Sequence, residues 1–158
     1  MNEFHEANRK GWDAVSPGWQ AKIEAQGSWR HAATDPTVVF DPLELSYLGD
    51  VKGKQVCVLG SGDNLVAFAL AGMGAQVTSV DISQTQLNTA AERARSLGLT
   101  LTFVRADVTD LAPLAASTFD LVYTGGHVAV WVADLNKYYA EAGRILKPGG
   151  LFIVNEYH

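Results

Sequence analysis

The stretch Gln55-Val56-Cys57-Val58-Leu59-Gly60-Ser61-Gly62-Asp63-Asn64 decides the fold of this chain. It begins with an apolar run rich in β-branched residues and ends in a Gly-x-Gly turn, and an unbroken apolar segment, 65–71, follows it. This order predicts a buried strand, a tight loop and the start of a helix. The glycines permit a sharp turn close to a ligand, and the free N–H groups at the helix start favour a carboxylate or phosphate. The stretch is therefore typical of a nucleotide-binding corner.

The composition predicts one globular domain with an N-terminal appendage. The 158 residues are 47% hydrophobic and 18% charged, which is enough for one core. A net charge of -5 and no basic block disfavour nucleic acid as a partner. The lone Cys57 excludes an internal disulfide, which fits a cytoplasmic location. The sequence contains neither a membrane-spanning apolar run nor a signal peptide pattern, so no membrane association is expected.

Residues 1–50 are predicted to form a separate helical lid segment. They hold three of the four tryptophans, Trp12, Trp19 and Trp29. A loose helical spacing at the start predicts a short helix that Ser16-Pro17-Gly18 breaks, followed by a loop over 26–37. Sharper signals begin at Asp41, which is a good N-cap before Pro42, and end at Gly49. These signals predict a helix of about two turns before the first strand.

From residue 51 to residue 158, strand and helix patterns alternate. The predicted strands are 55–59, 76–81, 101–105, 119–124 and 151–156. The predicted helices begin near residue 65, at the Ser83 cap, near Leu111 for a short helix to Ala115, and at the Asp134 cap. Strands joined by helices of this length pair in parallel with right-handed crossovers. The expected fold class is therefore α/β, with a doubly wound parallel sheet of five recognisable strands.

Ligands of such sheets bind beyond the carboxyl ends of the strands. Three acids, Asp63, Asp81 and Asp107, fall on that rim. Asp81 lies 21 residues beyond Gly60, where an acid accepts hydrogen bonds from ribose hydroxyls. Asp107 could accept from an adenine amine, with flanking backbone N–H groups reading the ring, or could cap its own loop. Asp63 is also favourable at a helix N-terminus without any ligand.

Two further features of the rim bear on the ligand. Gln86 is a candidate ligand residue, but a capping box with Ser83 competes for its side chain. A dinucleotide fingerprint requires a small residue at its sixth position, where this chain has Leu65. The loop therefore disfavours a nicotinamide dinucleotide.

The chain from residue 51 to residue 158 resembles the class I S-adenosylmethionine-dependent methyltransferases, which have a Rossmann-like fold. The stretches that carry the resemblance are Leu59 to Asn64, Val80 to Ser83, Arg105 to Asp107, Phe119 to Tyr123, and Ile145-Leu146-Lys147-Pro148-Gly149-Gly150-Leu151. The resemblance implies that S-adenosyl-L-methionine is the cofactor. It also implies that the glycine loop lies under the methionine part, Asp81 holds the ribose and Asp107 contacts adenine.

The predicted cofactor site joins this rim to the lid. By the resemblance, Trp12 and Trp19 belong to a lid over the cofactor, and Trp19 over the sulfonium could add a cation–π contact. The predicted cofactor-binding residues are Trp19, Gly60, Ser61, Gly62, Asp63, Asn64, Asp81, Ile82, Gln86, Ala106, Asp107, Val108 and Thr124. A metal site is not expected, because the four histidines are scattered.

The chain departs from the family pattern in three places. Val58 stands where family members commonly carry an acid, and Asn64 stands where they carry a third loop glycine. The family sheet usually continues after the fifth strand with a helix and two antiparallel strands. Here the apolar fifth strand, 151–154, would form an exposed edge. We therefore expect either a fragment of a longer protein or a homodimer that covers this edge.

The expected reaction is an in-line displacement in which an acceptor attacks the sulfonium methyl, and positioning supplies much of the acceleration. His127, after the fourth strand, is the candidate general base, although a loop histidine could equally pack or cap there. Tyr157 and His158 could also face the substrate. The acceptor is expected to be a small molecule. The alternatives are a non-catalytic S-adenosylmethionine-binding module and, less favoured, a nicotinamide-dependent oxidoreductase.

Overall fold

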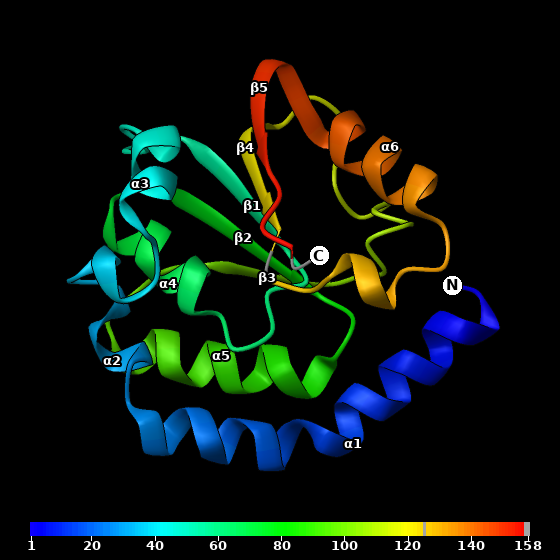
Figure 1. The fold of residues 1–158 in the computed structure, drawn as a ribbon, viewed down its shortest axis with the longest axis horizontal. Helices are drawn as coiled ribbons and strands as arrows, with labels where there is room; N and C mark the ends of the chain where they lie inside the picture. Colours follow the sequence, from blue (N-terminus) through cyan, green and yellow to red (C-terminus); the bar gives the residue numbers. More distant parts are fainter. Residues whose placement is uncertain (125, 157–158) are drawn as a thin grey trace.

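The computed structural model describes residues 1–124 and 126–156, and a parallel sheet forms its centre (Figure 1). Its strands are β1 (Gln55–Leu59), β2 (Gln76–Asp81), β3 (Thr102–Arg105), β4 (Phe119–Thr124) and β5 (Leu146–Ile153). They pair in the order β3-β2-β1-β4-β5, and each pair is parallel. The chain leaves β1 towards one edge and later returns to its other side, so the switch point lies between β1 and β4. The doubly wound α/β fold is confirmed.

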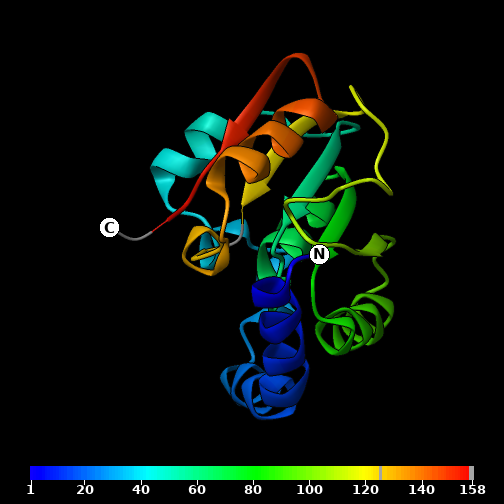
Figure 2. The same ribbon diagram turned by 90° about the vertical axis from the view of Figure 1, so that its right-hand side faces the viewer.

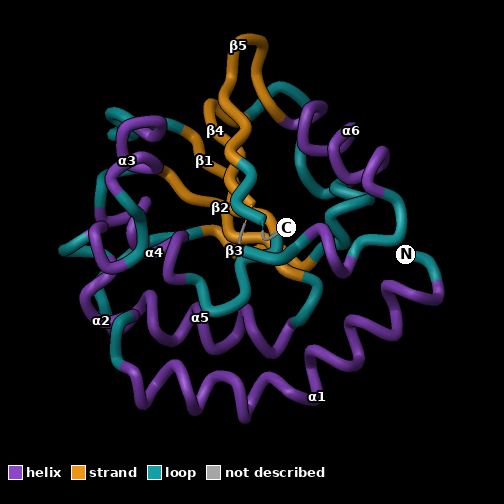
Figure 3. Tube along the Cα trace, viewed as in Figure 1, coloured by secondary structure: helices purple, strands orange, loops and turns teal. Residues whose placement is uncertain are grey.

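Helices cover both faces of the sheet (Figure 3). They are α1 (Glu3–Gln26), α2 (Trp29–Ala32), α3 (Pro42–Leu48), α4 (Leu65–Gly72), α5 (Gln84–Ser96) and α6 (Leu135–Ile145), with short 3-10 turns η1 (Pro36–Val38) and η2 (Ala129–Trp131). Side chains of β1 alternate between the two faces. Val56 and Val58 join the core under α4 and α5, whereas Cys57 and Leu59 join the core under α6.

Helix α1 differs from its prediction. It is one helix of 24 residues with Pro17 inside it, and it is not broken at residues 16–18. Asn2 caps its start by accepting from the His5 N–H at 2.8 Å, and Gly27 ends it in the left-handed conformation. Pro17 lacks an N–H and bends a helix, and the axis of α1 changes direction along its length in Figure 1. Ser16 and Gln20, on either side of Pro17, are buried, and Gln20 accepts from Arg93 of α5, so packing against α5 keeps the helix continuous.

Three other local predictions need correction. Residues 111–115 form turns instead of a short helix. The expected loop over 26–37 contains α2 and η1. Strand β5 begins at Leu146, so the Lys-Pro-Gly-Gly run lies within the strand, and a register shift interrupts its pairing with β4. The helix α3 is confirmed, with a reciprocal capping box between Asp41 and Glu44.

Within the described residues, β5 is an edge strand that pairs only with β4. The apolar side chains of Leu151, in β5, and of Val154, directly after it, are exposed. A homodimer through this edge stays a prediction. None of the helices in the described part of the chain has the length and apolar character needed to cross a membrane.

Helix α1 lies along α5, outside the sheet (Figures 1 and 2). Its C-terminal half adds Ile23 to the core shared by β1, α4 and α5. Its N-terminal half reaches the loops that follow β3 and β4, where it contacts Asp107 and Trp131. The helix is therefore placed to close the carboxyl edge of the sheet.

Candidate functional site

A cavity of about 610 Å³ lies at the carboxyl edge of the sheet, between the strand ends and α1. This position is the one that the doubly wound topology predicts. Most of the predicted site residues line it: Trp19, Gly60, Ser61, Gly62, Asp63, Asp81, Ile82, Gln86, Asp107, Val108 and His127. The three acids of the predicted rim therefore share one cavity.

The glycine loop after β1 holds a conformation that favours glycine. Gly60 and Gly62 have φ values of 61° and 51°, in the left-handed region. A Cβ on Gly60 would fall under 3.0 Å from the side chain of Val128, the N-cap of η2, so the loop is in direct contact with the start of that segment. The lack of a side chain at Gly60 thus serves both the turn and the packing of the segment after β4.

Asn64 stabilises the loop from below. It is fully buried with a φ of 64°, and its amide donates to the Gly62 carbonyl at 2.9 Å. Its side-chain oxygen accepts from the Ser79 hydroxyl at 2.5 Å. Asn64 therefore shapes the loop that lines the cavity, without lining the cavity itself.

Two other predicted site residues lie outside the lining. Ala106 donates its N–H to the Asp81 carbonyl at 3.1 Å, next to the cavity. Thr124 is fully buried at the end of β4, and its hydroxyl accepts from the Asn155 N–H at 3.2 Å. Tyr157 and His158, which could also face the substrate by their place in the sequence, lie outside the described residues.

Asp81 is buried at the end of β2, beside the glycine loop. Its carboxylate accepts from the backbone N–H groups of Gly62 and Ser83, each at 2.8 Å. Burial raises the pKa of Asp81, and these hydrogen bonds only partly offset the effect. Burial likewise raises the pKa of Asp63. A hydroxyl-bearing or positively charged ligand would favour the ionised forms of both acids.

Asp107 contacts a residue that sequence reasoning did not select. One carboxylate oxygen accepts from the N–H and hydroxyl of Thr109, and the other lies 2.7 Å from Nδ1 of His5 in α1. Nε2 of His5 accepts from the Ala133 N–H at 2.9 Å, so Nδ1 carries the proton and donates to Asp107. Burial acts to raise the pKa of Asp107, but these hydrogen bonds outweigh it and the pKa is lowered.

Asp13 holds the middle of α1 against the start of α5. Its carboxylate accepts from the Ser83 hydroxyl at 2.7 Å and from the Thr85 N–H at 3.3 Å. Arg9, one turn earlier in α1, donates to the other oxygen at 2.8 Å. A carboxylate at a helix N-terminus is favourable, so this contact stabilises both helices.

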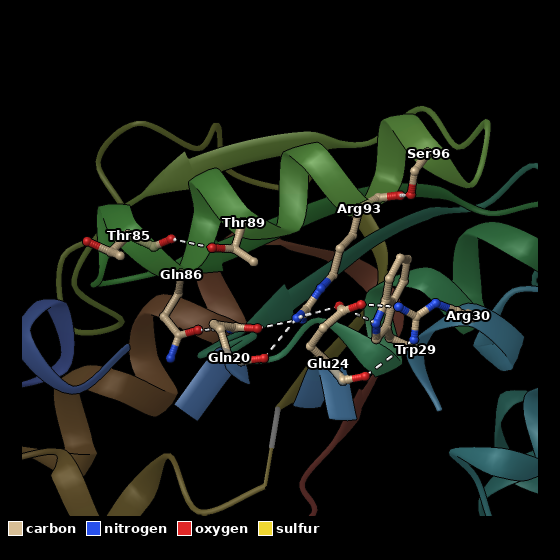
Figure 4. A network of polar contacts seen from close by, with 9 residues as sticks. All are labelled: Gln20, Glu24, Trp29, Arg30, Thr85, Gln86, Thr89, Arg93 and Ser96. Carbon is tan, nitrogen blue, oxygen red and sulfur yellow. Dashed lines mark hydrogen bonds and ion pairs between the residues drawn. The ribbon is translucent and has the colours of Figure 1, made fainter. Parts of the chain in front are cut away.

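A polar network fixes the C-terminal half of α1 to α5 (Figure 4). Arg93 of α5 is buried and donates to the side chain of Gln20 at 2.5 Å and to its carbonyl at 3.1 Å. The Arg93 guanidinium also lies 5.1 Å from the centre of the Trp29 ring, at cation–π distance. Burial lowers the pKa of Arg93, and the charge of Glu24 opposes that change.

Gln86 belongs to this network through Gln20. The Gln20 amide donates to the Gln86 side-chain oxygen, and the Ser83 hydroxyl accepts from the Gln86 N–H at 3.2 Å. The expected reciprocal half of the capping box is replaced, because the Ser83 N–H donates to Asp81. Gln86 therefore lines the cavity while it holds α1 in place.

Aromatic residues form the outer wall of the cavity. Trp12 of α1 meets Trp131 of η2 edge to face, with ring centres 5.3 Å apart. The Asn8 amide donates to the Trp131 carbonyl at 2.9 Å. The lining residues that sequence reasoning missed include His5, Asn8, Val66, Val128, Val130 and Val132. The cluster of tryptophans in residues 1–50 was the only local signal for this wall.

The cavity suits a ligand that carries hydroxyl or amine donors and a positive charge. Its volume lies within the range of about 300–1,000 Å³ that is usual for small-ligand sites. A carboxylate offers about four acceptor positions, so Asp81 can accept from a ligand in addition to the N–H groups of Gly62 and Ser83. Aromatic rings can also accept a cation. The fold is that of a Rossmann-like α/β protein, and its cavity lies where proteins of this class bind their ligands.

Comparisons with known proteins identify the family. The family model described as "Methyltransferase domain" matches residues 57–154, and the chain belongs to this family. The motifs and the fold are those of the class I S-adenosylmethionine-dependent methyltransferases, so the resemblance seen in the sequence is confirmed. The family implies S-adenosylmethionine as the cofactor, and the acids, loop and aromatic wall fit such a group.

Three similar proteins illustrate the match. A ubiquinone biosynthesis O-methyltransferase of Caulobacter sp. (strain K31) is 31% identical over 75% of this chain and 53% of its own length. The uncharacterized methyltransferase YbaJ of Bacillus subtilis is 30% identical over 97% of this chain and 62% of its own length. The solved structure of mmp1179 from Methanococcus maripaludis has a TM-score of 0.67 at 20% identity, covering 99% of this chain and 65% of that one, and shows the fold alone.

The chain is shorter than these relatives. It spans 53% of the Caulobacter protein and 62% of YbaJ. The remaining parts of both relatives lie outside the region that matches this chain.

Proposed function

We propose that the protein binds S-adenosyl-L-methionine and transfers its methyl group to a small-molecule acceptor. One observation carries the proposal: Asp63, Asp81 and Asp107 meet the glycine loop in one cavity that α1 and its tryptophans close. Each acid is held by backbone N–H groups, so the acceptor atoms are positioned before a ligand arrives.

The proposal gives each part of the site a task. Asp81 accepts from the ribose hydroxyls, Asp107 and Val108 meet the adenine, and the glycine loop with Asp63 surrounds the methionine end. When bound, the cofactor supplies an electrophilic methyl on a sulfonium. Trp19, which is 41% exposed at the cavity wall, stands near the positive charge. The residues thus hold two reactants in line and exclude water.

His127 is proposed as the group that takes the acceptor's proton. It lines the cavity after β4 with a φ of 69°, a conformation that few non-glycine residues adopt. Non-glycine residues held at such angles are often found at functional sites.

A second candidate is a cofactor-binding module without turnover. It is favoured by Val58, which occupies the position of a common family acid and is fully buried in β1. That candidate predicts cofactor binding with no methyl transfer to any nucleophile.

Isothermal titration with S-adenosylmethionine and S-adenosylhomocysteine tests the proposal. The native chain should bind both, and Asp81→Asn should weaken binding at least tenfold, equal to about 1.4 kcal/mol, because a carboxylate acceptor is lost. Glu92→Gln, which removes an exposed charge from α5, is the matched control and should bind as the native chain does. Equal affinities in the native chain and Asp81→Asn would contradict the assigned pocket.

A further inference from the structure

A second hollow lies between α1 and η2, beside the main cavity. It has a volume of about 220 Å³ and is lined by Ala7, Asn8, Gly11, Trp12, Val15 and Trp131. Asn8, Trp12 and Trp131 also line the main cavity. The two hollows therefore lie on either side of the same wall, which the edge-to-face pair of tryptophans forms.

The hollow lies beside a face of α1 on which two residues, Ala7 and Gly11, have small side chains or none. Ala7, Gly11 and Val15 recur every four residues, so they lie on one face of α1. An added Cβ on Gly11 would meet no atom within 4 Å, so neither packing nor backbone angle requires a glycine there. A glycine inside a helix costs about 0.5–1 kcal/mol relative to alanine. Gly11 therefore leaves open space beside the helix at a cost to helix stability.

The surface of the hollow is apolar. None of its lining side chains carries a charge, and the amide of Asn8 is committed to the Trp131 carbonyl. Apolar side chains around it are exposed, among them Trp131, Val130 and Val15 at 46%, 64% and 55%. Such an exposed apolar patch beside a cavity is typical of a ligand-binding groove.

The charges of the main cavity narrow the choice of ligand. Its described lining contains three acids and two histidines, but no lysine or arginine. The three acids are assigned to the cofactor, so the lining left for an acceptor is the uncharged side formed by Val128, Val130, Trp131 and Val132. An uncharged acceptor suits this apolar side, and its apolar part can use the second hollow.

We propose that the methyl acceptor is an uncharged molecule with an apolar tail, and that the hollow at Gly11 binds the tail while the reacting group enters the main cavity. The inference rests on the proposed function, because it assigns the acceptor half of the same site. Trp12 and Trp131 line both hollows, so this pair contacts both parts of the acceptor and determines specificity.

The test uses 4-n-alkylphenols with ethyl, butyl and hexyl chains, titrated into the native chain saturated with S-adenosylhomocysteine. Each methylene that enters the hollow should raise affinity about two- to fourfold. Gly11→Leu fills the hollow and should abolish the gain with chain length. Gly18→Leu is the matched control, since Gly18 is also in α1 with no atom within 4 Å of an added Cβ and lies outside both hollows.

Far-UV circular dichroism and thermal unfolding are measured for both variants to check that each one folds. A gain with chain length that survives in Gly11→Leu, or is absent from the native chain, overturns the proposal. The native chain is also sedimented with phosphatidylcholine vesicles, because a lipid surface is the other apolar surface that could cover this patch. Vesicle binding without any chain-length gain overturns the proposal in favour of that surface.

A failure of the proposed function can be distinguished from a failure of this inference. Cofactor titration is carried out on the same samples before any phenol is added, and Gly11→Leu should leave cofactor affinity unchanged. If S-adenosylhomocysteine does not bind, the proposed function fails. A chain-length gain that disappears only in Gly11→Leu would then still support an apolar ligand in the hollow.

Discussion

The glycine-bearing rim of the sheet and helix α1 line the same cavity, but different kinds of contact hold them. In the rim, hydrogen bonds join residues of one loop, such as the Asn64 amide and the Gly62 carbonyl, or the ends of two adjacent strands, such as the Gly62 N–H and Asp81, which are 19 residues apart. In α1, the partners of Asp13 and His5 lie 70 and 102 residues away. A local sequence pattern can therefore specify the rim, whereas α1 depends on the completed fold.

The pKa values of the acids also differ between the rim and the residues that contact or belong to α1. Burial dominates at Asp63 and Asp81, whose pKa values are raised. Hydrogen bonds outweigh burial at Asp13 and Asp107, which contact or belong to α1, and their pKa values are lowered. Carboxylates that hold the helix are thus well compensated, whereas two of those facing the cavity are not. This difference is what a site that awaits a positively charged ligand would show.

Substitution of Gly60 should have the largest effect, and it tests the rim. Gly60→Ala combines a left-handed backbone with a clash against Val128, and should lower the free energy of unfolding by about 3 kcal/mol. Gly62→Ala has a similar φ but no atom within 4 Å of its Cβ, and should cost about 1–2 kcal/mol. Urea unfolding of both variants measures the difference. Equal losses would mean that the contact between Gly60 and Val128 contributes nothing to the difference.

Removal of His5 should have an intermediate effect, and it breaks the link between the two regions. His5→Ala leaves the buried carboxylate of Asp107 and the Ala133 N–H without this partner, at an expected cost of about 2 kcal/mol in the free energy of unfolding. A double-mutant cycle with Asp107→Asn isolates the pair, and we expect a coupling of about 1–2 kcal/mol. Additive losses would show that the two side chains act independently.

The smallest effect is expected in the pH dependence of stability, and it concerns Asp13. Burial acts to raise its pKa, but hydrogen bonds from Ser83 and Thr85 and the charge of Arg9 lower it overall. Its stabilising effect is therefore complete above the ordinary value of about 4 and is lost as the pH falls through the folded-state pKa. Between pH 5 and pH 3, thermal unfolding of Asp13→Asn should shift less than that of the native chain.

The matched control for this measurement is Glu92→Gln, which removes an exposed acid from α5. It should retain the acid-induced shift of the native chain. If Asp13→Asn and the native chain lost stability equally over this range, the contact between Asp13 and α5 would not be linked to the protonation of its carboxylate.

The rim of the sheet and helix α1 also differ in how well the sequence predicts them. Strands β2 and β4 occupy the predicted ranges because their apolar runs and flanking turns are local signals. The continuity of α1 across Pro17 could not be predicted in this way, since the buried contacts of Ser16 and Gln20 override a helix-breaking residue. Asp107 was selected from its position after β3, but no pattern around His5 indicates its partner.

The contacts of His5 also set an order of events during synthesis. Its two partners, Asp107 and Ala133, are separated from it by 102 and 128 residues. At about 5–20 residues per second, a ribosome needs several seconds to add the last of them. The N-terminal segment therefore leaves the ribosome well before the surface that it covers exists. The cavity can close only after β4 and the segment beyond it have formed, so closure is a late step of folding.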